Sequence, residues 1–124
     1  MKRDIEKIRN IMLYLEENLE PNKEICSTDL PFYDKLDDND YLIMKEHITL
    51  LVESNLVEEH NVTLKGFKIF YFRRITNKGY DFLDALRNDN VWNEVKDKTV
   101  KAGGYTLSFL VELGKDYIKS ELLK

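Results

Sequence analysis

The sequence lacks the features that mark secreted and membrane proteins. It has one cysteine, Cys26, so it cannot form a disulfide within a single chain. It has no apolar run approaching the roughly 18 residues that a membrane-spanning helix needs. Its N-terminus, "MKRDIEKIRN", alternates charged and apolar residues and lacks the apolar block of a signal peptide. We therefore expect a cytoplasmic protein that does not associate with a membrane.

The sequence also lacks the motifs that carry catalysis in many enzymes. It has no glycine-rich phosphate loop, no Gly-x-Ser-x-Gly, no His-Glu-x-x-His and no Cys-x-x-Cys pair. The acidic run of residues 37–40 lacks the central glycine and distal glutamate of a calcium loop. His47, His60 and Cys26 would leave a zinc site one ligand short. We expect no enzymatic activity, no bound metal and no cofactor.

The charge of the chain is unevenly distributed, although its net value is only −4 over 124 residues. Residues 16–59 contain thirteen acidic and three basic side chains, whereas residues 61–76 contain four basic side chains and no acidic one. Residues 77–124 hold equal numbers of both signs. The hydrophobic fraction of 43% is sufficient for a packed core. The pattern predicts a folded protein in which an acidic region adjoins a short basic ribbon.

The spacing of apolar residues predicts several elements in a definite order. Spacings of three and four predict helices over residues 4–19 and 41–55, with a short strand or turn between them. The β-branched and aromatic residues of the segment 57–76 predict a hairpin that turns at Lys65-Gly66. Helical patterns follow up to residue 102, and Gly103-Gly104 separates them from a last amphipathic helix. We predict one domain over residues 1–102 and a packing or oligomerisation helix over residues 103–124.

Local signals refine this outline. Asp40 or Asn39 is expected to cap the second helix, and Asn55 to end it in the left-handed conformation. His47 is expected to be half-buried on that helix, and Leu122 to face inward on the last one. The second strand of the hairpin is apolar on both faces, so we expect another element to cover each face.

Two strings resemble signatures of bacterial winged-helix regulators. "HITLLVESNLV" (residues 47–57) is similar to the string that ends the recognition helix, and "ITNKGYDFL" (residues 75–83) is similar to the string that follows the wing. In the second string, the resemblance implies that Thr76 caps the next helix and that Gly79 allows a close approach to the sheet. Together with the element order, it implies an α+β, mostly helical fold. The architecture that the resemblance implies is a winged helix-turn-helix with a two-stranded wing and added C-terminal helices.

A wider resemblance covers most of the chain. The segments 1–20, 47–57, 75–98 and 103–123 resemble a family of short bacterial and phage proteins catalogued as a domain of unknown function. This resemblance implies a phage or mobile-element context. It transfers no catalytic or binding residue.

One hypothesis is a DNA-binding transcriptional regulator that uses the wing. The candidate DNA contacts are two residues of the second helix and four of the hairpin: Lys45, Thr49, Lys65, Lys68, Arg73 and Arg74. Arg73 and Arg74 should point to opposite faces of their strand, so we expect at most one of them to reach DNA. Double-stranded DNA would meet repulsion from Glu46 and Glu53 on the same helix.

The alternative hypothesis is an acidic protein–protein interaction module, for example an effector that binds a repressor or a host protein. The acidic second helix favours a basic protein partner. The amphipathic C-terminal helix also predicts a homodimer in which two copies of that helix pair. The sequence leaves both hypotheses open.

Overall fold

The structure is a computed structural model that describes residues 1–102 and 106–124. It is α+β and mostly helical, with a small three-stranded antiparallel sheet and a wing-like hairpin, as the sequence predicts. The chain divides into two compact units, Met1–Gly79 and Tyr80–Lys124. The expected break at Gly103-Gly104 lies outside the described residues. None of the described helices combines the length and the apolar character needed to cross a bilayer.

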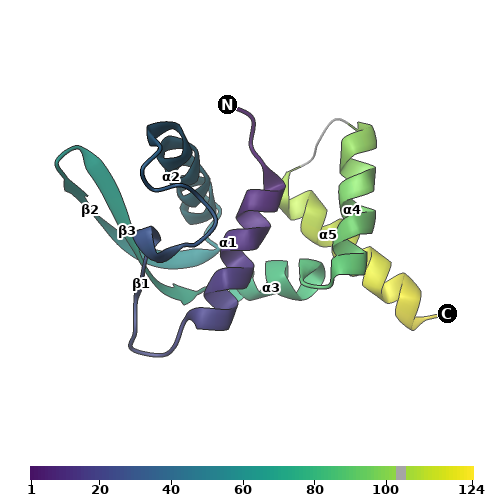
Figure 1. Ribbon diagram of the computed structural model, residues 1–124. Helices are drawn as coiled ribbons and strands as arrows, with labels where there is room; N and C mark the ends of the chain where they lie inside the picture. Colours follow the sequence, from purple (N-terminus) through teal and green to yellow (C-terminus); the bar gives the residue numbers. More distant parts are fainter. Residues whose placement is uncertain (103–105) are drawn as a thin grey trace. The chain divides into compact units, whose positions relative to one another are not determined.

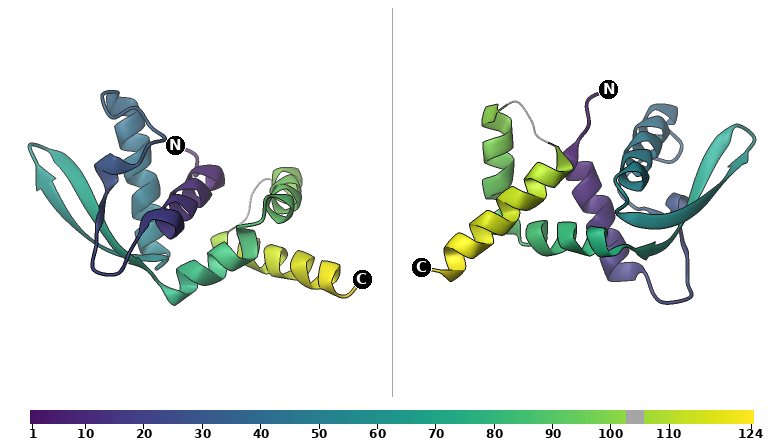
Figure 2. Two further views of the ribbon diagram at one scale, coloured as in Figure 1. Left: turned by 60° about the horizontal axis from the view of Figure 1, so that its bottom comes forward. Right: turned by 180° about the vertical axis from the view of Figure 1, so that it is seen from behind.

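The first unit contains two helices, one short 3-10 turn and all three strands (Figure 1). In chain order they are α1 (Ile5–Asn18), β1 (Ile25–Cys26), η1 (Ser27–Asp29), α2 (Asp38–Glu53), β2 (Val57–Leu64) and β3 (Phe67–Ile75). The order in the sheet is β1-β3-β2, so β3 is central and β2 forms one edge. The tip of the β2–β3 hairpin projects away from α1 (Figures 1 and 2).

Side-chain caps set where both helices of this unit begin. Asp4 caps α1 as a hydrogen-bond acceptor for the backbone N–H of Glu6. The cap of α2 is Asp37, which accepts from the N–H groups of Asn39 and Asp40. The expected cap at Asp40 or Asn39 is therefore wrong by a few residues, because several consecutive acidic and amide residues can all serve as caps. Asn55 has a φ of 60°, which confirms the predicted left-handed end.

The core of the first unit lies between the two helices and one face of the hairpin. It consists of fully or nearly fully buried apolar side chains, chiefly Ile8, Ile11, Met12, Leu15, Met44, Ile48, Leu51, Phe70 and Phe72. His47 is 1% exposed, so the expectation that it is half-buried is wrong. Its Nδ1 is 2.7 Å from the Ile43 carbonyl oxygen, and its Nε2 accepts from the Asp4 N–H at 2.9 Å. The ring is buried because it bridges the start of α1 to α2.

The segment after the hairpin closes the first unit, as the resemblance implied. Thr76 Oγ1 accepts from the Gly79 N–H at 3.0 Å and donates to the Asn55 carbonyl at 2.6 Å. A Cβ at Gly79 would lie 2.1 Å from the Leu56 carbonyl oxygen. Only glycine permits this approach, so Gly79 fixes the end of the hairpin to the turn after α2.

The second unit is helical. It contains most of α3 (Asn77–Leu86) together with α4 (Asp89–Ala102) and α5 (Leu107–Leu122). Its buried side chains include Phe82, Leu83, Leu86, Val91, Trp92, Val95, Leu107 and Leu110. The backbone of α3 approaches α5 closely, because a Cβ at Gly114 would lie 2.6 Å from the Ala85 carbonyl oxygen. Leu122 is 80% exposed, so the prediction that it faces inward is wrong.

Candidate functional site

The accessible face of α2 is acidic and has an apolar residue at its centre. Met44, Ile48 and Leu51 occupy the buried face. The exposed positions of the helix are Asp38, Asn39, Leu42, Glu46 and Glu53. This face therefore offers carboxylates and one leucine, which is 55% exposed. The carboxylates of such a surface repel phosphate groups.

The two candidate DNA contacts on α2 are only partly accessible. Lys45 and Thr49 are both half-buried. The Thr49 hydroxyl donates to the Lys45 carbonyl oxygen at 2.9 Å within the helix. These residues are one turn apart, so the structure brings them together, but it gives the hydroxyl an internal partner.

Both arginines of the hairpin lie near carboxylates. Arg74 forms an ion pair of 2.9 Å with Glu58 across the hairpin, and Arg73 Nε lies 4.0 Å from Glu24. A bulge between Glu58 and Glu59 gives β3 an additional residue here, so both arginines are exposed while Phe72 is buried. More than half of each arginine side chain is exposed, so each pair contributes at most about 1 kcal/mol to stability. The two carboxylates nevertheless offset the positive charge of the arginines at the base of the hairpin.

The lysines of the hairpin differ in their surroundings. Lys65 occupies the turn with a φ of 51° and is exposed, and no ion pair or ring contact of it is seen among the described residues. The Nζ of Lys68 lies 5.2 Å from the centre of the Phe70 ring, in cation–π geometry. Of the four bases in the predicted ribbon, only Lys65 is fully available.

The outward side of the hairpin forms an apolar surface. We call it the outer hairpin face and define it by three cross-strand pairs on the side opposite buried Phe70 and Phe72: His60 with Tyr71, Val62 with Ile69, and Leu64 with Phe67. Val62, Leu64 and Phe67 are 39%, 56% and 49% exposed. The Tyr41 ring of α2 contacts the Phe67 ring edge-on, with centroids 5.1 Å apart, but no described element covers Val62 and Leu64. The expectation that another element covers each face is therefore wrong for this part of the hairpin.

The Tyr71 end of the outer hairpin face carries a polar cluster. The His60 ring stacks on Tyr71 with centroids 5.0 Å apart, and His60 Nε2 is hydrogen-bonded to Glu24. This contact and the Arg73 approach to Glu24 make one side of the face polar. The apolar surface is therefore concentrated toward the turn.

The two edges of the hairpin are unequal. The β3 edge is occupied over much of its length. The short strand β1 pairs with Tyr71 and Phe72, and Ser27 Oγ accepts a hydrogen bond from the Phe70 N–H. The Tyr41 hydroxyl is hydrogen-bonded to both the N–H and the carbonyl of Lys68. Since Lys68 and Phe70 direct their backbone groups to that edge, their partners Thr63 and Asn61 direct theirs to the opposite edge. No described residue bonds to those outward groups. The β2 edge is therefore open for a further strand.

Sequence reasoning missed the role of five residues that define this surface and its edges. The alternation of His60, Val62 and Leu64 with polar neighbours is a period-two signal that could have identified the outer hairpin face. Ser27 and Tyr41 had no comparable signal, because their role depends on the contact between the β1 region, α2 and β3. Within the part of the chain that the structure describes, no group of three His, Cys, Asp or Glu side chains is arranged to hold a metal ion.

The loop beside β1 has an internal hydrogen-bond arrangement. The Cys26 thiol lies 3.0 Å from the Thr28 hydroxyl, and the Tyr33 hydroxyl donates to the Ser27 carbonyl at 3.3 Å. Burial raises the pKa of Tyr33 above its ordinary value, with smaller contributions from Cys26, Tyr41 and Asp29. Tyr33 therefore remains a neutral donor at physiological pH and helps to hold Ser27 against β3.

Comparison with known proteins assigns the chain to a family. Residues 2–105 match the family described as "Hypothetical protein (DUF2513)". A protein of Haemophilus influenzae named "Uncharacterized protein" is 32% identical over 108 residues, which cover 87% of this chain and 86% of that protein. No solved structure matches significantly. The match over most of its length shows that the chain belongs to the DUF2513 family.

Proposed function

We propose that the protein is a non-catalytic protein-binding module on a winged-helix scaffold, and that its hairpin binds an extended segment of a partner as an additional strand. The observation that carries the proposal is the combination of the apolar outer hairpin face with the open β2 edge. The proposal keeps the cytoplasmic setting and the phage or mobile-element context that the sequence predicts.

The backbone of β2 would supply the direction and register of binding. Asn61 and Thr63 each turn an N–H and a carbonyl outward, and these groups can form a ladder with a partner strand. Edge strands are usually shielded by charge, proline or a covering element. Here the shielding is confined to the start of β2, where Glu58, Glu59 and the bulge lie. The second half of the strand is the part available for pairing.

The side chains of the outer hairpin face would supply affinity. Val62, Leu64 and Phe67 are each about half exposed, so covering them contributes roughly 1 kcal/mol per side chain. They lie on one side of the added strand, so the partner should present apolar residues at alternate positions. Affinity and specificity would then come from different groups of the same hairpin.

The charge of the unit indicates the charge of the partner. Residues 16–59 have ten more acidic than basic side chains, and the exposed face of α2 is acidic. A partner segment that carries lysine or arginine beside its apolar positions would be attracted to this region. We therefore propose a basic protein as the partner, with an extended apolar segment at the contact.

A displayed library of short random peptides tests the proposal. Selection against the full chain should enrich segments that alternate apolar residues with lysine or arginine. An enriched peptide should bind Thr63→Ala like the original protein and should lose binding to Thr63→Pro. Proline removes the outward N–H of this edge residue while the ladder bonds to β3 remain.

Two results would contradict this proposal. One is a selection that enriches no peptide. The other is an enriched peptide that binds Thr63→Pro and Leu64→Lys as tightly as it binds the original chain. Circular dichroism of both variants checks that the hairpin remains folded.

DNA binding through the wing is the second candidate function. The observation in its favour is that Lys65 is exposed at the tip of a hairpin whose segment 61–76 has four bases and no acid. Fluorescence anisotropy with a random duplex at several salt concentrations distinguishes the two functions. A wing that binds phosphates gives salt-dependent binding that Lys65→Ala with Lys68→Ala weakens. The protein-binding proposal predicts no such binding, since both arginines lie near acids.

A further inference from the structure

The second unit has a groove between α3 and α5 that lies apart from the hairpin in sequence and in chemistry. Its volume is about 490 Å³. Its floor is apolar and includes Ile118 and Leu122 of α5 and Leu123 directly after it. Leu122 and Leu123 are 80% and 75% exposed, which makes them two of the most exposed large hydrophobic residues in the described chain. A surface of this kind usually marks an interaction site.

The close contact between Gly114 and Ala85 explains why the groove exists. At this point the backbones of α3 and α5 are too close for a Cβ on Gly114. Beyond it, α5 continues to Leu122, whereas α3 ends at Leu86. The last turns of α5 therefore present apolar side chains with too little of α3 beside them to cover them.

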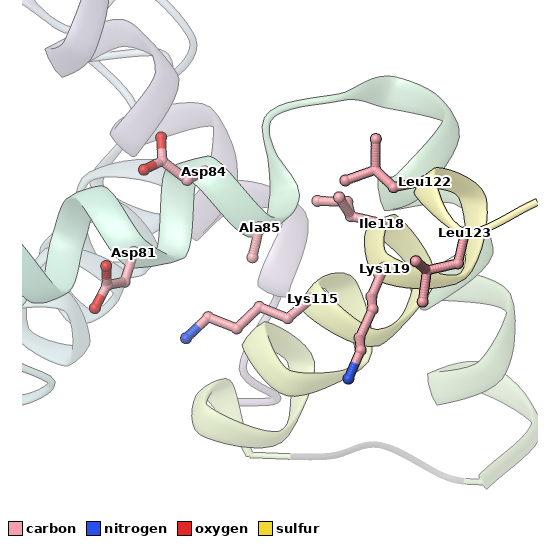
Figure 3. Close-up of a pocket in the computed structure, with 8 residues that line it drawn as sticks. All are labelled: Asp81, Asp84, Ala85, Lys115, Ile118, Lys119, Leu122 and Leu123. Carbon is pink, nitrogen blue, oxygen red and sulfur yellow. The ribbon is translucent and has the colours of Figure 1, made fainter.

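The rims of the groove carry opposite charges. Figure 3 shows Asp81 and Asp84 projecting from α3, and Lys115 and Lys119 projecting from α5. Asp84 pairs at 3.0 Å with Arg87, which follows the last residue of α3, and Lys115 lies 3.9 Å from Glu112. Asp81 and Lys119 form no ion pair with any described residue. No ion pair joins the two rims among the described residues, and Asp81 and Lys119 provide one charge on each rim for an outside partner.

We propose that the occupant of this groove is the same groove of a second copy of the chain. Each copy carries an acidic rim and a basic rim. In a two-fold arrangement, the acidic rim of one copy meets the basic rim of the other, and both such contacts form at once. Leu122 and Leu123 of each copy then cover the apolar floor of the other. A different protein would need charges complementary to both rims and exposed apolar side chains between them. A second copy of the chain already has both.

Charge reversal tests the proposal directly. Asp81→Lys with Asp84→Lys places two basic rims against each other, and Lys115→Glu with Lys119→Glu places two acidic rims against each other. Each variant alone should dimerise at least about tenfold more weakly, because both symmetric contacts become repulsive. The two variants mixed in equal amounts should restore dimer, because all rims are then complementary. Sedimentation equilibrium of the full chain measures each case.

Matched controls separate this contact from general effects of charge. Asp116→Lys and Lys98→Glu also reverse exposed charges of the second unit, but they lie outside the groove and should leave dimerisation unchanged. Leu122→Asp with Leu123→Asp should abolish the dimer. Circular dichroism confirms that each variant is folded.

Three outcomes would overturn the proposal. They are a chain that is monomeric at every concentration, a dimer that the charge reversals do not weaken, and a mixture of the two variants that does not recover dimer. The last outcome would show that the rims do not meet, even if the chain self-associates elsewhere.

Discussion

The outer hairpin face of the first unit and the α3–α5 groove of the second unit both leave apolar side chains exposed, but they differ in polar character. The hairpin offers an open strand edge near the acidic exposed face of α2, and its two arginines, Arg73 and Arg74, lie near carboxylates. The groove has rims of both signs, Asp81 and Asp84 against Lys115 and Lys119. We therefore propose that one surface binds a different molecule and that the other binds a second copy of the chain. The charge pattern around an apolar patch thus helps to identify its partner.

The largest expected effect comes from the glycines on which the two surfaces depend. Gly79→Ala should destabilise the protein by about 3 kcal/mol, because the new Cβ would lie 2.1 Å from a backbone oxygen that cannot move freely. Gly114→Ala should cost somewhat less, at roughly 2 kcal/mol, since its closest contact is 2.6 Å. Urea unfolding measures both changes.

Each of these two variants should impair the function of one surface only. Gly79→Ala should impair peptide binding, and Gly114→Ala should impair dimerisation. The control is Gly66→Asn, because no atom lies within 4 Å of a Cβ there and asparagine tolerates a positive φ. A Gly79→Ala protein as stable as the original would refute the close approach at Leu56.

His47→Ala should destabilise the protein by about 2 kcal/mol. The substitution leaves the Asp4 N–H and the Ile43 carbonyl without the side chain that now bonds to both, and it opens a cavity beneath α1. Thermal unfolding provides the measurement, and His60→Ala is the exposed control. Equal stability of the two variants would show that the His47 bridge is unimportant.

Substitutions of exposed leucines should distinguish the two surfaces with little effect on folding. Leu64→Lys should weaken peptide binding about tenfold and leave dimerisation unchanged, since a charge then occupies the outer hairpin face. Leu122→Asp should weaken dimerisation by a similar factor and leave peptide binding unchanged. If either variant impaired both activities, the two surfaces would not be functionally separate.

The smallest expected effect concerns the base of the wing. Arg74→Ala should change stability by less than about 1 kcal/mol, because the Arg74–Glu58 pair is exposed to solvent. The same variant should not alter binding of a selected peptide. If it abolished duplex binding measured at low salt, Arg74 would be free to contact DNA and the second candidate function would gain support.

The elements with strong local signals were predicted from the sequence. The hairpin follows from its β-branched and aromatic residues and the Lys65-Gly66 turn, and the left-handed Asn55 follows from its position after α2. The sequence also predicted the Thr76 cap and the close approach at Gly79 through a resemblance. The hairpin turn, the end of α2 and the Thr76 cap depend on residues that are neighbours in the chain, whereas the contact of Gly79 with Leu56 was predicted only through the resemblance.

The features that sequence reasoning missed depend on contacts between distant residues. His47 is buried because α1 begins against it, which no pattern within α2 could reveal. Leu122 has the helical spacing of a core residue, but it is exposed because α3 ends before it. The open edge of β2 became visible only after Ser27 and Tyr41 were found on the other edge. The DNA-contact residues, the function and the division into residues 1–102 and 103–124 stay predictions.

Amide hydrogen exchange at Asn61 and Thr63 tests the central claim most directly. In the free protein their outward N–H groups should exchange rapidly, because no described group bonds to them. Saturation with a selected peptide should slow exchange at both residues, since each N–H then donates to the added strand. Exchange at both residues that stays equally fast while the peptide is bound would contradict strand addition.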